Sequence, residues 1–240
     1  MRRAAPAKSR NRPKLQRRRS TLPRQMDPIA LPSGTMWHLH AAGQKLGYRA
    51  QLPGARVYDL VGRGVRAAKA RGVGDADRLM FALPASWLVN SPAVSTVLRR
   101  WALPPHDETC LALLEVLEGG PDAWAEDAGT AESVRLALAS LGSEPYVTEA
   151  ISKVMALLAP DVVPLMPAPA RGFVLGDGAK DAPDAFMRIV EWFARTVAEH
   201  RGALEGVARE HREVELTAGG VLDRLLWFDS EGHRHFPAIP

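Results

Sequence analysis

The stretch Phe186-Met187-Arg188-Ile189-Val190-Glu191-Trp192-Phe193-Ala194-Arg195-Thr196-Val197 decides the fold class. Its large apolar side chains recur at spacings of three, four, seven and eleven residues, which places them on one face of an α-helix. Asp181 and Pro183, just before it, are typical helix start signals. This stretch therefore predicts an amphipathic helix that packs against a core.

Similar patterns predict helices along the rest of the chain. One helix carries the apolar residues 147–158 and ends at Ala159, because Pro160 cannot continue the hydrogen-bond ladder. Another follows Thr217, which is a suitable N-cap. Further helices are expected near residues 36–48, 55–71, 92–101, 107–118 and 130–141. The best strand pattern is the alternation at 213–216, and no repeated βαβ units are present. We therefore predict an all-α fold with residues 28–240 as a single helical domain.

Composition agrees with one globular domain. The 240 residues are 46% hydrophobic and 24% charged, which is enough for one substantial core. Cys110 is the single cysteine and lies among leucines, so no disulfide framework is expected. No apolar run is long enough for a membrane span, and no signal peptide follows the basic N-terminus. These features predict a soluble, cytoplasmic protein with no membrane partner.

The N-terminal residues differ sharply from the rest. Residues 1–25 hold ten of the 31 Lys and Arg and none of the 27 Asp and Glu, so the remainder carries a net charge of −6. With prolines and few large apolar residues, residues 1–27 are expected to form a disordered basic tail that could hold nucleic-acid phosphates non-specifically. Translated GC-rich DNA upstream of a start at Met26 would have the same composition. Both interpretations stay open.

Charge is also divided within the body of the chain. Residues 36–101 hold ten Lys and Arg against three acids, whereas residues 102–134 hold eight acids and no Lys or Arg. We expect the acidic stretch to be a solvated face, and the two segments could face each other. An interaction with a protein partner, whose identity is unknown, would use the acidic stretch together with an exposed Trp101 or Trp124.

A row of basic residues marks the predicted helix at 55–71. The candidate nucleic-acid contacts are Arg56, Arg63, Arg66, Lys69 and Arg71. In a helix the first three fall near one face and could follow a phosphate backbone, although such a row is also typical of a solvated face.

The sequence offers few other sites. Gly72-Val73-Gly74 resembles the turn of a helix-hairpin-helix, but Asp75 follows at once with negative charge. His233 and His235 are a weak candidate metal pair. The sequence has no P-loop, no nucleophile elbow and no activated cysteine, so no cofactor is expected and the enzyme hypothesis is weakened.

Two stretches resemble a known family. They are Ser152-Lys153-Val154-Met155-Ala156-Leu157-Leu158-Ala159-Pro160-Asp161-Val162-Val163-Pro164-Leu165-Met166 and Val221-Leu222-Asp223-Arg224-Leu225-Leu226-Trp227. Both are similar to the uncharacterised bacterial DUF6308-type proteins, which themselves resemble the helical domain of helix-hairpin-helix DNA glycosylases. The resemblance implies a glycosylase-like helical scaffold.

The resemblance also implies a catalytic carboxylate that this chain lacks. In the family pattern an apolar-Pro-apolar segment usually ends in the aspartate that active glycosylases use, whereas here the segment reads Pro164-Leu165-Met166-Pro167-Ala168-Pro169. Met, Pro and Ala can neither activate water nor stabilise positive charge on a sugar.

The first hypothesis is therefore a non-catalytic helical protein that contacts nucleic acid non-specifically. One alternative is an enzyme with an unrecognised pocket around Lys153 and Asp223, which are the weak catalytic candidates, and another is a protein-interaction module.

Overall fold

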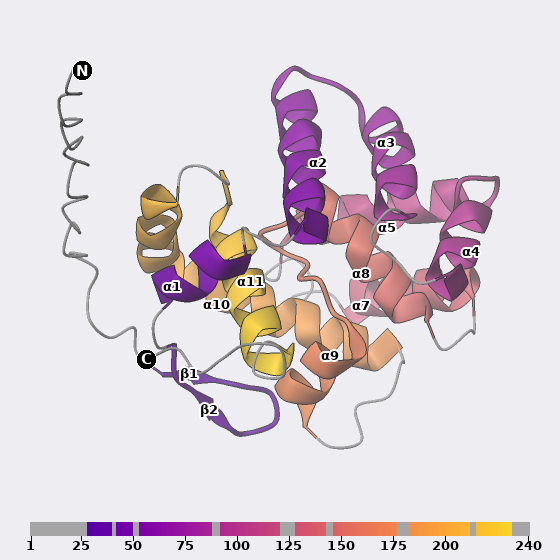
Figure 1. Ribbon diagram of the computed structural model, residues 1–240. Helices are drawn as coiled ribbons and strands as arrows, with labels where there is room; N and C mark the ends of the chain where they lie inside the picture. The colour runs from indigo at the N-terminus through magenta and orange to yellow at the C-terminus, as the bar shows by residue number, and fades with distance from the viewer. Residues whose placement is uncertain are drawn as a thin grey trace, which may run out of the picture.

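The computed structural model describes residues 28–39, 42–49, 53–87, 92–120, 128–142, 146–176, 183–211 and 215–231. These residues are mostly helical, with one small two-stranded sheet, so the predicted all-α class is confirmed (Figure 1). The helices are α1 (Ala42–Arg49), α2 (Pro53–Ala70), α3 (Asp75–Trp87), α4 (Pro92–Trp101), α5 (His106–Glu118), α7 (Ala128–Leu141), α8 (Val147–Leu158), α9 (Ala168–Leu175), α10 (Pro183–Glu210) and α11 (Ala218–Glu231).

Several helix ends follow from the local sequence signals. Helix α8 ends at Leu158 with Ala159 as its C-cap, as Pro160 predicts. Helix α11 begins after Thr217, whose Oγ1 accepts a hydrogen bond from the backbone N–H of Gly220 at 3.0 Å. Helix α10 begins at Pro183, where the fixed φ of proline suits the first turn.

The helix predicted at 36–48 is wrong in its first half. Strands β1 (Ile29–Ala30) and β2 (Met36–Trp37) pair antiparallel, and helix α1 begins only at Ala42. The indole N–H of Trp37 donates to Asp229 at 2.7 Å, a contact with α11 that no local pattern reveals. The alternation at 213–216, the best strand pattern in the sequence, forms no strand at residues 215 and 216, which are the part of it that the structure describes.

Helices α3 and α9 were not predicted, because prolines interrupt both. Pro84 lies inside α3 and is exposed, so the helix continues past it on its solvent side. Helix α9 begins with Pro167 as its N-cap residue, where a missing N–H costs nothing.

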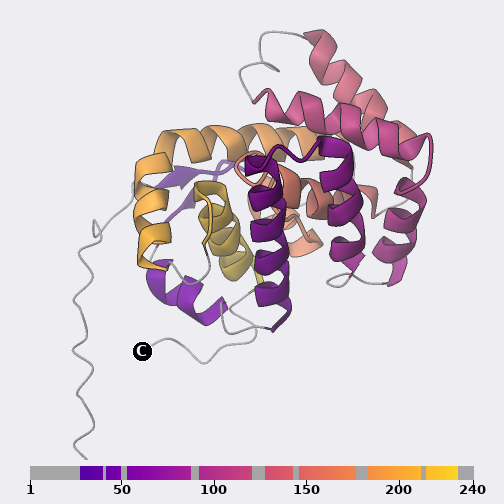
Figure 2. The ribbon, with the colours of Figure 1, turned by 90° about the horizontal axis from the view of Figure 1, so that it is seen from above.

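The described core consists of two hydrophobic clusters. The first cluster is built mainly by α2, α3, α4, α5, α7 and α8, and the second by β1, β2, α1, α9, α10 and α11. Helix α10 supplies Phe186 and Val190 to the first cluster and Phe193 and Val197 to the second. Figure 2 shows this helix running along one side of the molecule from one part to the other.

The basic and acidic segments do meet, at one point. Glu118 at the end of α5 accepts a 2.5 Å bond from Lys69 and lies 3.6 Å from Arg78, which is buried in α3. Part of the acidic stretch thus neutralises the basic segment instead of facing solvent. Within the described residues, none of the helices is long and apolar enough to cross a membrane.

Candidate functional site

Charged residues are buried where α2, α8 and α11 meet. Arg224 of α11 forms ion pairs with both Asp59 of α2 and its neighbour Asp223, and all three side chains are buried. The Arg224 guanidinium also lies over the Tyr58 ring, 5.8 Å from its centroid. We call Tyr58, Asp59, Asp223 and Arg224 the buried charge cluster. It lies where α2 and α8 of the first core contact α11 of the second.

The cluster is anchored to the backbone around it. The Tyr58 hydroxyl donates to the carbonyl oxygen of Lys153 at 2.7 Å, and Asp223 Oδ1 accepts from the N–H of Leu165 at 2.7 Å. Burial by itself lowers the pKa of Arg224, but the carboxylates of Asp59 and Asp223 raise it more, so this pKa lies above its usual value. The cluster thus holds one guanidinium between two carboxylates, and its arginine stays protonated.

A small cavity borders this cluster. The centre of a water molecule can reach only about 20 Å³ of this cavity, so the cavity has room for about one water. Its polar lining comes from Asp59, Arg66, Thr217, Asp223 and Arg224. An organic substrate needs several hundred Å³, so this cavity suits a bound water and not a substrate.

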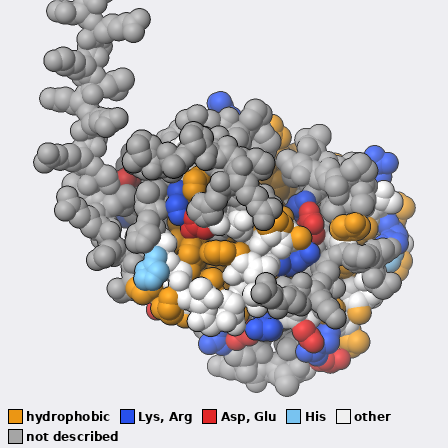
Figure 3. Space-filling model, turned by 60° about the horizontal axis from the view of Figure 1, so that its bottom comes forward, with side chains coloured by type: hydrophobic (Ala, Val, Ile, Leu, Met, Phe, Trp, Pro, Cys, Tyr) orange, Lys and Arg blue, Asp and Glu red, His pale blue; other side chains and the backbone are white. Residues whose placement is uncertain are grey.

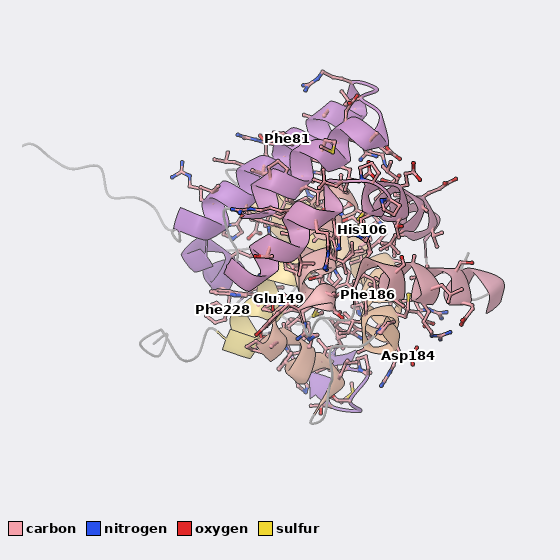
Figure 4. The ribbon with its side chains drawn as sticks, turned by 90° about the vertical axis from the view of Figure 1, so that its right-hand side faces the viewer. Phe81, His106, Glu149, Asp184, Phe186 and Phe228 are labelled. Atoms are coloured by element: carbon pink, nitrogen blue, oxygen red, sulfur yellow. The ribbon has the colours of Figure 1, made fainter. Side chains whose placement is uncertain are left out.

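The small cavity is lined by only one of the two catalytic candidates. Asp223 borders the small cavity, whereas Lys153 borders neither that cavity nor the open groove between the end of α10 and the start of α11. Lys153 is only 9% exposed, and its ammonium donates to Glu149 at 2.5 Å. Glu149, labelled in Figure 4, lies in the first turn of α8.

The segment 164–169, where the sequence resemblance implied a catalytic carboxylate, is held by structural bonds. Met166 is 2% exposed and packs in the second core, and its N–H donates to Ser152 Oγ at 3.3 Å. Asp223 and Ser152 thus bind the backbone of this segment, which carries no acid of its own. The Asp223 carboxylate is bound to the Leu165 N–H and to the Arg224 guanidinium.

The basic residues of α2 divide into two groups. Arg56, Arg63 and Arg71 are exposed, and Arg63 makes an exposed ion pair with Glu215 at 3.4 Å. Arg66 turns toward the protein and donates to the carbonyl oxygen of Glu215 at 2.7 Å. Its pKa is lowered, first by burial and then by the like charge of Arg224. Lys69 is bound to Glu118, so the exposed arginine row consists of Arg56, Arg63 and Arg71.

This row lies on a pair of helices that projects from the molecule. Helices α2 and α3 stand side by side and are joined at their outer end by the Gly72–Gly74 turn, where Gly72 has a φ of +79° (Figure 1). Elsewhere, on the face drawn in Figure 3, acidic and basic side chains alternate without a continuous patch of either sign among the coloured residues. The arginine row of α2 differs from that face because its side chains all carry the same charge.

Other predicted contacts are either buried or outside the described residues. Trp101 was expected as an exposed contact, but it is fully buried and its indole N–H donates to Leu141 O at 2.9 Å. Trp124, the pair His233 and His235, and the tail 1–27 lie outside the described residues. Among the described residues there is no group of three or more His, Cys, Asp or Glu that could hold a metal ion.

Sequence reasoning did not identify Asp59 or Tyr58 as partners of the 221–227 segment. The only signal for Asp59 was an acid within an otherwise basic helix. Comparisons with protein-family models, with curated proteins and with solved structures found no match for this chain.

Proposed function

We propose that this protein is a non-catalytic, nucleic-acid-associated helical protein that contacts the phosphate backbone through the exposed arginine row of α2. The observation that carries the proposal is the placement of Arg56, Arg63 and Arg71. The first two are seven residues apart, two helical turns, so they lie on the same side of α2, and Arg71 follows directly after the helix end.

The electrostatic setting supports this proposal. The only acid within α2 is Asp59, which is buried and paired with Arg224, so α2 places no carboxylate beside the row. The exposed Arg63–Glu215 pair is worth little in water and can be exchanged for a phosphate contact. Contacts of this kind give binding with little sequence preference.

Two observations favour binding without catalysis. The Asp223 carboxylate is occupied by Arg224 and the Leu165 N–H, and the glycosylase-like segment carries the buried Met166 instead of an exposed acid. Relationship to the DUF6308-type family and a glycosylase-like scaffold remain part of the proposal, since they rest on the two stretches of sequence.

The test is a salt series of anisotropy measurements with labelled single- and double-stranded oligonucleotides. The chain begun at Met26 is compared with its R56Q/R63Q/R71Q variant, because glutamine keeps helix propensity while removing charge. If all three arginines contact phosphate, the slope of log K against log salt becomes shallower by about 2 for single strands, at roughly 0.7 per contact.

The matched control is R188Q/R195Q/R209Q, which removes three exposed arginines from α10 instead. This control variant should keep most of the slope of log K against log salt that the parent chain shows. Equal losses in both triple variants would mean that binding follows net charge alone, and binding confined to the full-length chain would assign it to the tail; either result contradicts the proposal.

A further inference from the structure

The α2–α3 pair also carries an exposed apolar surface beside the arginine row. Among the described residues, the large apolar side chains exposed on these two helices are Val57, Leu60, Met80 and Phe81, with exposed fractions of 42%, 48%, 49% and 51%. Pro84 is exposed as well, one turn after Phe81. Single exposed apolar residues are ordinary, but such a group on one helix pair marks a contact surface.

Gly64 determines how Phe81 lies on this surface. A Cβ built on Gly64 would be 3.7 Å from Phe81 Cε1, so the ring rests against the glycine of α2 while half of it stays open to solvent. Gly64 directly follows Arg63 in the sequence, and Leu60 lies one helical turn before Gly64. Figure 4 shows Phe81 at the outer part of the helix pair. An aromatic ring is thus held beside an arginine row.

We propose that this surface binds single-stranded nucleic acid, with a base stacked on Phe81 and the phosphates along Arg56, Arg63 and Arg71. The inference rests on the proposed function and names its substrate class. A basic track beside an exposed aromatic ring is the arrangement by which proteins hold single strands, because every base has a face that can stack. In a duplex the bases already stack on one another, so the ring has no base to receive.

Charge fixes which side of the surface each part of the strand occupies. Asp77 is exposed on α3, one turn before Phe81, whereas the arginines lie on α2. Phosphates are attracted to the α2 side and repelled from the α3 side, which leaves the uncharged bases over Phe81 and Pro84. Replacing Asp77 with asparagine should therefore tighten binding.

The experiment measures binding of labelled single strands and duplexes of equal length to the chain begun at Met26 and to its F81A, F81Y, L136A and D77N variants. We expect F81A to weaken single-strand binding about tenfold without changing the salt slope, because stacking releases no counterions. F81Y should retain binding, and L136A, which removes an exposed apolar side chain from α7, outside the surface, should have little effect. D77N should increase affinity at low salt.

The outcomes separate this inference from the proposed function. If R56Q/R63Q/R71Q lowers the slope but F81A changes nothing, the arginine row binds phosphate and the stacking inference is overturned. If duplex binds as well as single strand in every variant, the inference fails in the same way. If instead the parent chain self-associates in sedimentation experiments and F81A abolishes this, the surface is an interface between copies of the chain.

Discussion

Cys110 lies in α5 with its side chain fully buried in the first core. Burial, and to a smaller extent the charge of Asp107, raises the pKa of this thiol to about 12. Since only the thiolate is reactive, the folded chain should resist thiol reagents at pH 8, and labelling should report unfolding. The apolar setting of this residue was already evident from its leucine neighbours in the sequence.

The same pKa predicts how stability changes in alkali. The unfolded thiol loses its proton near pH 9, whereas the folded thiol keeps it until about pH 12. The unfolded state therefore binds fewer protons in this range, and stability falls as the pH rises from 9 toward 12. Urea titrations of the parent and of C110A at pH 8 and pH 10.5 measure this difference. A loss with pH that is equal in both proteins would contradict it.

At the scale of elements, the contact between α11 and the end of α8 depends on a glycine. A Cβ on Gly219 would lie 2.6 Å from the Cα of Asp161 and would clash with the carbonyl of Pro160. The carboxylate of Asp161 accepts a hydrogen bond from the Gly219 N–H at 2.8 Å, so the two segments touch backbone to backbone. This close approach explains why a residue with low helix propensity stands in the first turn of α11.

We expect G219A to destabilise the protein by roughly 1–3 kcal/mol, because the backbone of the α8–α9 connection must move to admit the methyl group. The matched control is G202A in α10, where nothing lies within 4 Å of the added Cβ. That substitution should stabilise the helix by up to about 1 kcal/mol. Thermal and urea unfolding of both variants measure the difference, and equal effects in the two would argue against the close contact.

Sequence reasoning at this scale succeeded where signals were local. The cap at Thr217, the end of α8 before Pro160 and the long helix around Phe193 all follow from residues within a few positions. It failed at α3, where Pro84 is tolerated on an exposed side, and at Met36, where pairing with β1 decides the conformation.

For the whole molecule, the buried charge cluster is one contact between the two hydrophobic cores, beside helix α10, which packs in both. Asp59 is 7% exposed, and replacing it with asparagine would leave Arg224 with only Asp223 as a counter-charge. Breaking a buried ion pair in this way typically costs about 3–5 kcal/mol. We expect D59N to lower the midpoint of urea unfolding. The shift should be the same whether unfolding is followed by helicity or by Cys110 labelling, because α10 packs in both cores.

The control is R135Q, which removes an exposed arginine paired with Glu132 and Asp184 and should leave the midpoint unchanged. If D59N shifted only one of the two readouts, the cores would unfold separately and the cluster would not couple them.

By itself the sequence determined the all-α class, the positions of most helices and the lack of an acid in residues 164–169, because helical periodicity, capping and residue identity are local. Tertiary structure alone decided that Lys153 and Trp101 are buried, that Arg66 turns inward and that Arg224 meets Asp59, 165 positions away. A charged residue in a helix looks the same in sequence whether it faces solvent or another helix. Its burial and its partner depend on how distant helices pack.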